Sequence, residues 1–424
     1  MWENERKKMI IRNVIICLVL VLAATGLFMA MNSVRKQIAE EDALLSAERT
    51  NQRQELSDAR QENLDVLQQT YEKDLETVAQ YLPGIVCWGD SLTAGSSGNV
   101  SYPLVLQKCI NTYLCDIYDI RFSLDNPETY SRVNWEDYQI SIPVVNMGAG
   151  QEDTATVLGR AGVVPYVVKT DFVIPAGKES VPIFIESEDG RTVSPLTAGS
   201  AGVNPVTIAG VEGTLVRTSN ARGRAQSPYQ FTRLEEGAET SVAKGTEIVT
   251  SCMDEYCDYI HIVWLGTYGD YGTPEKLVSD TKALLQRQNI NGDRFLVIGP
   301  CTTKGTWRTI SVTSLDAIDS AMLQAFGNHY INLRKYLIED GLRDAGLSSS
   351  ENTVSGTVPV TFRSYAGGAD MNSVAYQLIG KLVYERMDSL GYFDEVLAEL
   401  NLDKITQEIL KSDPEYFDTQ LKMD

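Results

Sequence analysis

Residues 85–95 read IVCWGDSLTAG, and this stretch decides the fold. The short apolar run Ile85–Trp88 predicts a buried strand, and Gly89 permits a sharp turn at its end. Ser91 would then stand at the carboxyl edge of a sheet, ahead of the helical pattern of residues 102–115. This order of strand, turn and helix predicts an α/β domain.

Further strand and helix patterns follow along the chain. The runs 144–150 (VVNMGAG), 260–266 and 295–299 predict sheet strands that end in glycine, and 371–380 (MNSVAYQLIG) predicts a helix with one apolar face. Strands that alternate with helices favour a parallel sheet. We therefore expect an α/β fold with a doubly wound, mainly parallel sheet between two helical layers.

These blocks resemble a known family. Residues 89–92 (GDSL) closely resemble the first motif of SGNH/GDSL hydrolases, residues 144–150 and 260–266 are similar to the second and third, and 371–380 is similar to the helix after the catalytic Asp-x-x-His. The resemblance implies the same three-layer fold. It also implies that Ser91 occupies the nucleophile position of an ester hydrolase.

The chain departs from the family pattern at four positions. Asp370 stands where the resemblance places the histidine, and Gly367 where it places the aspartate. Tyr268 replaces the oxyanion asparagine and Gln151 replaces a glycine, although a backbone N–H there could still donate. A serine hydroxyl needs a base within hydrogen-bond reach. The sequence therefore predicts that Ser91 is not activated.

The chain has two histidines, and neither is a good substitute base. His261 lies within an apolar strand, and His329 lies well upstream of the final loop. Both are interpreted as structural residues. Ser91 is then expected to serve as a turn residue whose hydroxyl caps the following helix.

The amino terminus predicts a membrane anchor. Residues 14–31 form an uncharged apolar run that is long enough to cross a bilayer with help from its flanks. Four basic residues precede it, which places residues 1–13 in the cytoplasm and the rest of the chain outside: Arg6, Lys7, Lys8 and Arg12. A cleaved signal peptide ending near 24–26 is the alternative, and it leads to the same extracytoplasmic location.

Composition divides the remaining chain into four parts. Residues 32–82 lack glycine and proline and predict a solvated helical stalk. An SGNH-like domain is expected over 83–164 and 250–393, and a helical extension of unassigned role over 394–424.

The segment 165–249 is too long for one crossover and predicts an inserted β-rich domain. The insert is interpreted either as a structural cap or as a glycan-binding platform. The platform would use four aromatic residues: Tyr166, Phe172, Tyr229 and Phe231.

The charge and the cysteines exclude several classes of partner. A net charge of -20 argues against nucleic acid. No Cys/His cluster has metal-ligand spacing, so no metal or cofactor is expected. Cys109 with Cys115, or Cys252 with Cys257, could form disulfides, and free thiols are the alternative.

Two functions are compatible with these observations. The first is a membrane-anchored, catalytically impaired protein that binds a cell-envelope glycan or a partner protein in the former substrate cleft. The alternative is an active serine esterase or deacetylase acting on acylated surface polysaccharide. A structural component of an envelope complex is a third possibility.

Overall fold

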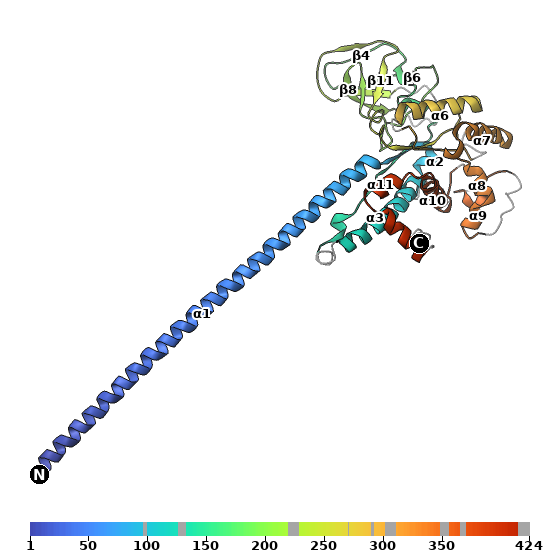
Figure 1. Ribbon diagram of the computed structural model, residues 1–424. Coiled ribbons are helices and arrows are strands. Elements are labelled where there is room, and N and C mark those ends of the chain that lie inside the picture. Colours follow the sequence, from blue (N-terminus) through green and yellow to red (C-terminus); the bar gives the residue numbers. More distant parts are fainter. Residues whose placement is uncertain are drawn as a thin grey trace. The chain divides into compact units, whose positions relative to one another are not determined.

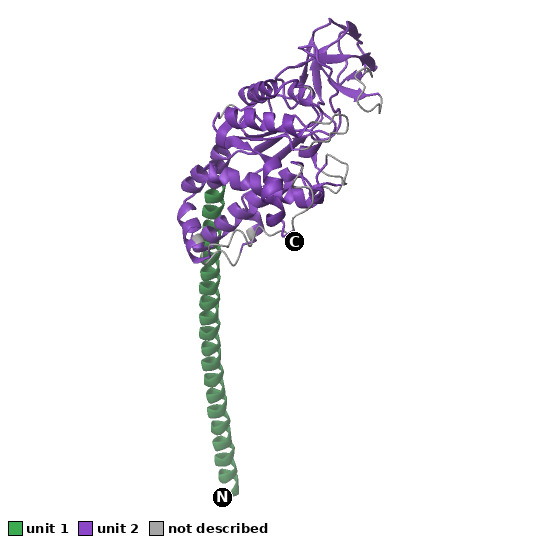
Figure 2. Cartoon of the chain, turned by 90° about the vertical axis from the view of Figure 1, so that its right-hand side faces the viewer, with its two compact units in different colours: residues 1–72 green, residues 73–424 purple. Residues whose placement is uncertain are grey.

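The computed structural model describes residues 1–95, 100–125, 133–218, 229–269, 271–289, 292–301, 311–347, 356–364 and 370–413. The chain divides into two compact units, residues 1–72 and 73–424, which Figure 2 colours separately. Gly367, a position singled out from the sequence, lies outside the described residues.

The chain begins with one continuous helix, α1, which spans Trp2–Tyr81. It contains no proline and one glycine, Gly26, and Pro83 follows its end. Within the described part of the chain, α1 is the one helix long and apolar enough to cross a membrane. The apolar run expected at 14–31 lies within α1, and the helix expected at 32–82 lies within it except for its last residue.

A five-stranded parallel sheet forms the centre of the second unit, with strand order β14-β13-β12-β1-β2. Its strands are β1 (Ile85–Gly89), β2 (Val144–Gly148), β12 (Ile260–Trp264), β13 (Phe295–Ile298) and β14 (Tyr330–Ile331). The first two strands in sequence are neighbours, and the third lies on the other side of β1. The order therefore reverses between β1 and β12, which makes this pair the topological switch point of a doubly wound sheet.

Helices cover both faces of this sheet (Figure 1). Helices α3 (Tyr102–Asp125) and α10 (Ser373–Ser389) pack together on one face, where Tyr102 meets Trp264 of β12 with ring centroids 5.8 Å apart. Helices α6 (Pro274–Gln288) and α7 (Val312–Phe326) pack on the other face against Val86 and Trp88 of β1. The predicted α/β fold with a parallel sheet is therefore confirmed.

Shorter helices complete the domain. They are α2 (Ser91–Ala94), η1 (Trp135–Tyr138), α5 (Thr154–Arg160), η2 (Gly327–His329), α8 (Leu333–Glu339), α9 (Gly341–Asp344), η4 (Val360–Phe362), α11 (Asp394–Glu399) and α12 (Asp403–Ser412).

The carboxyl-terminal helices help to fix the end of α1. Arg121 of α3 forms an ion pair with Asp74, and Tyr118 donates a hydrogen bond to the same carboxylate at 2.8 Å. Arg121 also donates to the carbonyl of Leu400, between α11 and α12, at 2.7 Å. One guanidinium thus joins three segments that are far apart in the sequence.

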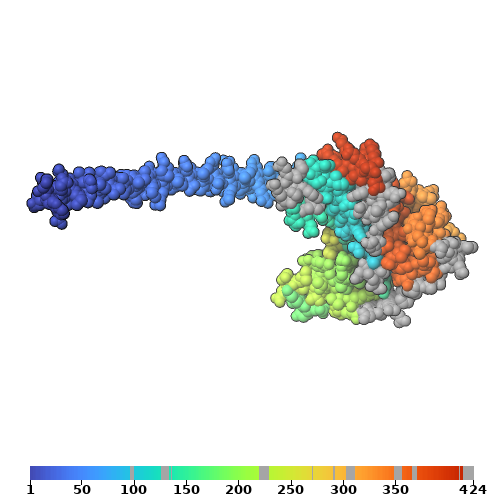
Figure 3. Space-filling model, turned by 90° about the horizontal axis from the view of Figure 1, so that it is seen from below, coloured from blue at the N-terminus to red at the C-terminus, as the bar shows by residue number. Residues whose placement is uncertain are grey.

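A second, antiparallel sheet lies between α5 and β12 in the chain and forms a lobe of its own (Figure 3). Its strand order is β5-β9-β8-β7-β11-β3-β6, and β4 and β10 form a separate pair. The bounds are β3 (Tyr166–Val168), β4 (Phe172–Ile174), β5 (Val181–Ile183), β6 (Ile185–Ser187), β7 (Val206–Ile208), β8 (Val211–Arg217), β9 (Tyr229–Arg233), β10 (Thr240–Val242) and β11 (Glu247–Thr250). The first strand, β3, pairs with the last, β11.

The aromatic residues of this insert form its core. Tyr166 and Phe231 are 0% exposed and Tyr229 is 4% exposed, and Phe172 packs against the same cluster. A binding platform needs ring faces that a ligand can reach. The hypothesis of a glycan platform built on these four residues is therefore wrong, because burial of the rings stabilises the small sheet instead.

Candidate functional site

The turn after β1 brings two strand ends into close contact with α2. A Cβ atom on Gly89 would lie 2.8 Å from the carbonyl oxygen of Trp264, and one on Gly148 would lie 2.1 Å from the backbone nitrogen of Ala94. Real Cβ atoms do not approach backbone atoms this closely. Glycine at the ends of β1 and β2 therefore allows α2 to sit directly on the carboxyl edge of the sheet.

Asp90, rather than Ser91, caps α2. The Asp90 carboxylate accepts a hydrogen bond from the backbone N–H of Leu92 at 2.9 Å, and Asp90 has the extended backbone typical of a cap residue. Ser91 is the first residue of the helix. The expectation that the Ser91 hydroxyl caps this helix is therefore wrong, and that hydroxyl is directed to another partner.

The partner of Ser91 is a tyrosine on the neighbouring strand end. The Oγ atom of Ser91 and the phenolic oxygen of Tyr268 are 2.5 Å apart. Tyr268 lies in the turn after β12, where Gly269 N–H donates to Gly266 O and Thr154 N–H donates to Gly269 O, both at 3.2 Å. Since β1 and β12 flank the switch point, the two hydroxyls meet where doubly wound sheets bind their ligands.

Both histidines are engaged elsewhere in the fold. His261 accepts a hydrogen bond from the Trp88 indole on Nδ1 at 3.2 Å, and its Nε2 lies 3.1 Å from the carbonyl of Tyr256. Burial lowers the pKa of His261 to about 4, so its neutral form fits this arrangement. His329 stacks on Phe295, the first residue of β13, and so lies at the opposite, amino-terminal edge of the sheet.

The carboxyl group of Asp90, which precedes Ser91, lies within electrostatic range of the Asp370 carboxylate. The pKa of Asp90 is raised to about 7, mainly by burial; the charges of Asp370 and Glu152 act in the same direction, and hydrogen bonds from Leu92 N–H and Thr267 act against it. Asp370 precedes α10 and is held by a hydrogen bond from Ser364 N–H to its carbonyl at 2.9 Å. The final loop therefore reaches the same edge of the sheet as Ser91.

The segment after β2 is ordered by its own side chains. Asn146 accepts a hydrogen bond from Gly148 N–H at 2.9 Å and donates to the carbonyl of Ala94 at 3.3 Å. Gln151 is exposed and has a φ of 66°, in the left-handed region that favours glycine. Gln151 thus has a backbone conformation that glycine adopts more easily.

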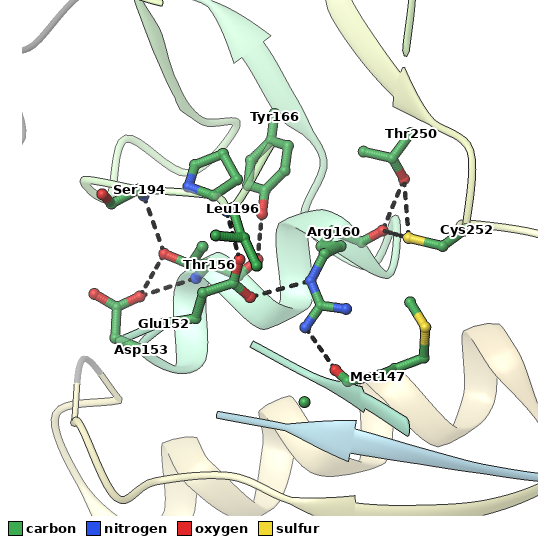
Figure 4. Close-up of polar contacts among 12 residues, drawn as sticks. Met147, Glu152, Asp153, Thr156, Arg160, Tyr166, Ser194, Leu196, Thr250 and Cys252 are labelled. Carbon is green, nitrogen blue, oxygen red and sulfur yellow. Dashed lines mark hydrogen bonds and ion pairs between the residues drawn. The ribbon is translucent and has the colours of Figure 1, made fainter. Parts of the chain in front are cut away.

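A buried ion pair links this edge to the inserted sheet (Figure 4). The Nε atom of Arg160 donates to Glu152 at 3.0 Å, and the two side chains are 0% and 1% exposed. The other oxygen of Glu152 accepts from Leu196 N–H of the insert at 2.9 Å, and Arg160 also donates to Met147 O at 2.9 Å. Burial acts to lower the pKa of Arg160, but the Glu152 carboxylate outweighs it and the net shift is upward.

Two further buried groups lie at the carboxyl edge. Cys301, which follows β13, is fully buried, and burial together with the Asp90 charge raises the pKa of its thiol. Burial also raises the pKa of Tyr376 of α10, and Asp370 and Asp90 add to that shift. Sequence reasoning assigned no role to Asp90, Cys301 or the Glu152–Arg160 pair. The usable signal was their position just after successive strands of a parallel sheet.

The site contains no side-chain set for a metal ion within the described ranges, where no three His, Cys, Asp or Glu residues are grouped to hold one. All seven cysteines are free thiols, so neither Cys109 with Cys115 nor Cys252 with Cys257 is bridged. Comparisons of the chain with protein-family models, with curated proteins and with solved structures found no match.

Proposed function

We propose that this chain is a membrane-anchored, extracytoplasmic SGNH/GDSL-hydrolase-like protein that binds a cell-envelope glycan at the carboxyl edge of its parallel sheet without hydrolysing it. The supporting observation is the 2.5 Å contact between Ser91 and Tyr268, which gives the serine a phenol as its partner. Both histidines have other partners.

A phenol is a poor base for serine. Its ordinary pKa is about 10, so it is protonated near neutral pH and cannot accept the serine proton. Loss of the base in a serine hydrolase typically lowers kcat by a factor of about 10⁴ to 10⁶. Ser91 at this edge is therefore assigned to ligand contact rather than to nucleophilic attack.

The groups at this edge suit a sugar. Ser91 and Tyr268 provide hydroxyls, and Asp370 provides a carboxylate that is partly accessible. Sugar hydroxyls are both donors and acceptors, and a carboxylate accepts two of them strongly. A neutral or basic glycan is favoured, because the chain carries a net charge of -20 and would repel an anionic polymer.

The anchor supports an outward orientation. The basic residues at 6–12 precede the apolar part of α1, and the positive-inside rule favours a cytoplasmic amino terminus for such a helix. The sheet and its insert would then face the cell envelope.

A second candidate function is an unconventional esterase on acylated polysaccharide. It is favoured by the intact Gly89–Leu92 motif and by the short contact that positions the Ser91 hydroxyl. In that case the Ser91 hydroxyl would need a proton acceptor within hydrogen-bond reach, and Tyr268 is its neighbour.

One experiment separates the two functions. The full-length protein in lipid nanodiscs is incubated with a fluorophosphonate and, separately, with O-acetylated envelope polysaccharide from the producing cells. We expect saturable binding, no acetate release and no label. Ser91→Ala should weaken binding about 10-fold through loss of one hydrogen bond to the ligand, whereas Ser320→Ala, at an exposed serine of α7, should not. Label or acetate release that Ser91→Ala abolishes would establish the esterase instead.

A restoration test addresses the family assignment. Gly367→Asp combined with Asp370→His would supply the base and the residue that orients it. Acetate release by this double variant, dependent on Ser91, is the expected result if the final loop follows the SGNH pattern. Unchanged inactivity would count against that alignment or against the oxyanion hole, where Tyr268 is retained; the glycan-binding measurement on the unmodified protein does not depend on it.

A further inference from the structure

Helix α1 exposes a row of apolar side chains beyond its membrane-spanning stretch. Every residue of α1 up to Asn63 is exposed. The row follows a seven-residue spacing and consists of Ile38, Leu45, Ala59 and Val66. The three large side chains of the row are each at least 50% exposed. Because a helix in water gains most of its stability from packing of an apolar face, this row is a candidate surface for another helix.

The spacing is that of a two-stranded coiled coil. When the row is placed at position d of a heptad lettered a to g, Leu56 and Asn63 fall at a, the other seam position. An asparagine at a pairs with its own copy and fixes the register of two strands. The remaining seam positions between 38 and 66 are polar: Asp42, Arg49 and Gln52. The apolar content of the seam is therefore modest, and charge has to specify the partner.

Charged side chains flank the seam in a pattern that fits a parallel copy of the same helix. Position g carries glutamate in four successive heptads: Glu41, Glu48, Glu55 and Glu62. Position e carries Arg53 and Arg60. In a parallel pair, g of one helix meets e of the other helix five residues further along. Glu48 then meets Arg53 of the second copy, and Glu55 meets Arg60 of the second copy, on both sides of the seam.

These flanking charges have no opposite charge within reach on their own helix. Ion pairs along a helix join residues three or four positions apart. No oppositely charged residue stands at those distances from Glu48, Arg53, Glu55 or Arg60. Within the described chain none of the four forms an ion pair. The spacing of the charges therefore suits pairing between helices and not support of a single helix.

The face away from the seam shows the opposite arrangement. Gln54 donates a hydrogen bond to Asp58, and Gln61 donates one to Asp65, both at 2.8 Å. These residues occupy positions c and f, which face solvent in a two-stranded coiled coil. The outer face is thus satisfied within the helix, whereas the charges beside the seam are not.

We propose that residues 38–66 of α1 form a parallel coiled coil with the same residues of a second copy of this chain. Glutamate at g and arginine at e of one helix are complementary to themselves, which a partner of different sequence does not require. Chains anchored in one membrane through the apolar part of α1 lie parallel, and anchoring raises their effective concentration. A seam of modest apolar content is then sufficient.

Disulfide trapping tests the seam. Ala59→Cys, at position d, is made in a Cys17→Ser background, because Cys17 is the exposed native thiol of α1. The full-length protein is diluted into liposomes and oxidised with copper phenanthroline, and dimer is measured on a non-reducing gel. Gln61→Cys, at the outer position f, is the matched control for random collision. We expect Ala59→Cys to give at least about 5-fold more dimer than Gln61→Cys.

Charge reversal tests the pairs, with Ala59→Cys as the reporter. Glu48→Arg with Glu55→Arg gives arginine on both flanks, and Arg53→Glu with Arg60→Glu gives glutamate on both. Each reversed chain alone should form at least about 5-fold less dimer, because like charges then meet across the seam. When the two reversed chains carry tags of different size and are mixed, a mixed dimer should form at close to the original yield.

A matched control changes the same amount of charge on the outer face. Asp58→Arg with Asp65→Arg should leave trapping through Ala59→Cys unchanged, because both positions face solvent in the coiled coil.

Three results would overturn the proposal. They are equal trapping at positions 59 and 61, absence of a mixed dimer from the two reversed chains, and equal loss of dimer in the outer-face control. If a reversed chain does not enter liposomes, the comparison of Ala59→Cys with Gln61→Cys decides. None of these readouts involves Ser91 or polysaccharide, so they are independent of the proposed glycan site.

Discussion

Glu152→Ala removes one partner from the buried ion pair that joins α5 to the inserted sheet. Arg160 would remain 0% exposed without its carboxylate, and its Nη1 already has no hydrogen-bond partner among the described residues. Breaking a buried pair in this way costs about 3–5 kcal/mol. The lost hydrogen bond from Leu196 N–H falls within that figure, so we expect about 4 kcal/mol of destabilisation.

The assay is thermal unfolding of the full-length protein, followed by tryptophan fluorescence. Trp88 is a suitable reporter, since the Arg160 guanidinium lies 5.4 Å from its ring centroid. A loss of about 4 kcal/mol corresponds to a Tm decrease of about 8 °C for a domain of this size. Limited proteolysis should also show earlier cleavage of the insert, because Leu196 loses its contact with α5.

Two control variants test whether the loss of stability comes from breaking the buried pair. Glu186→Ala breaks the partly exposed pair with Lys169, at 3.2 Å, and should change stability by less than about 1 kcal/mol. Glu152→Gln together with Arg160→Met removes both charges and should recover most of the loss. A Glu152→Ala protein that unfolds within about 1 kcal/mol of the wild type would refute the role assigned to this pair.

Three further predictions concern the turn regions at the carboxyl edge. The pKa of Asp90 is raised to about 7, so the folded state keeps the Asp90 proton up to a higher pH than the unfolded state does. The free energy of unfolding should therefore fall as pH rises from about 4 to 7. Unfolding of Asp90→Asn, measured over the same pH range, should lack this slope. Gly148→Ala should destabilise the protein by about 2 kcal/mol and disturb the Ser91–Tyr268 contact. Gly150 has open space around it, so the free energy of unfolding of Gly150→Ala should differ from that of the wild type by less than about 0.5 kcal/mol in the same assay. Gln151→Gly should raise stability by about 1 kcal/mol, because φ is 66° there, and an unchanged or lower Tm would contradict that account.

The parallel sheet was predictable because its strands are short apolar runs that end in glycine. Residues 85–89 and 144–148 follow that pattern, and 260–264 is followed by a glycine at 266. The side chains of 85–89 and 260–264 are buried on both faces, whereas the first three residues of 144–148 are partly buried. Strand β14 was not predicted. It has two residues, Tyr330 and Ile331, too few for any periodic signal.

The site was predictable in its positions but not in its contacts. Motif spacing indicated Ser91, Tyr268 and Asp370, but a spacing along the chain contains no distance between side chains. The bond between Ser91 and Tyr268 depends on the packing of two turns, and the capping role fell to Asp90 because its side chain was one residue closer to the strand end. The choice between a structural cap and a glycan platform for the aromatic residues of the insert stayed open at the sequence level, because exposure cannot be read from composition.

The pairing of β3 with β11 has a consequence for how this protein could have acquired its second sheet. Val167 lies opposite Glu247 and Tyr166 opposite Ile248, so the chain leaves the α/β domain and returns to it at adjacent points. The two ends of the insert lie side by side, as the ends of a hairpin loop do. Lengthening the insert between them therefore adds little to the entropy cost of closing it. Changes in the length of the insert are therefore expected to leave the parallel sheet in place, provided that the contact of Leu196 with Glu152 is kept.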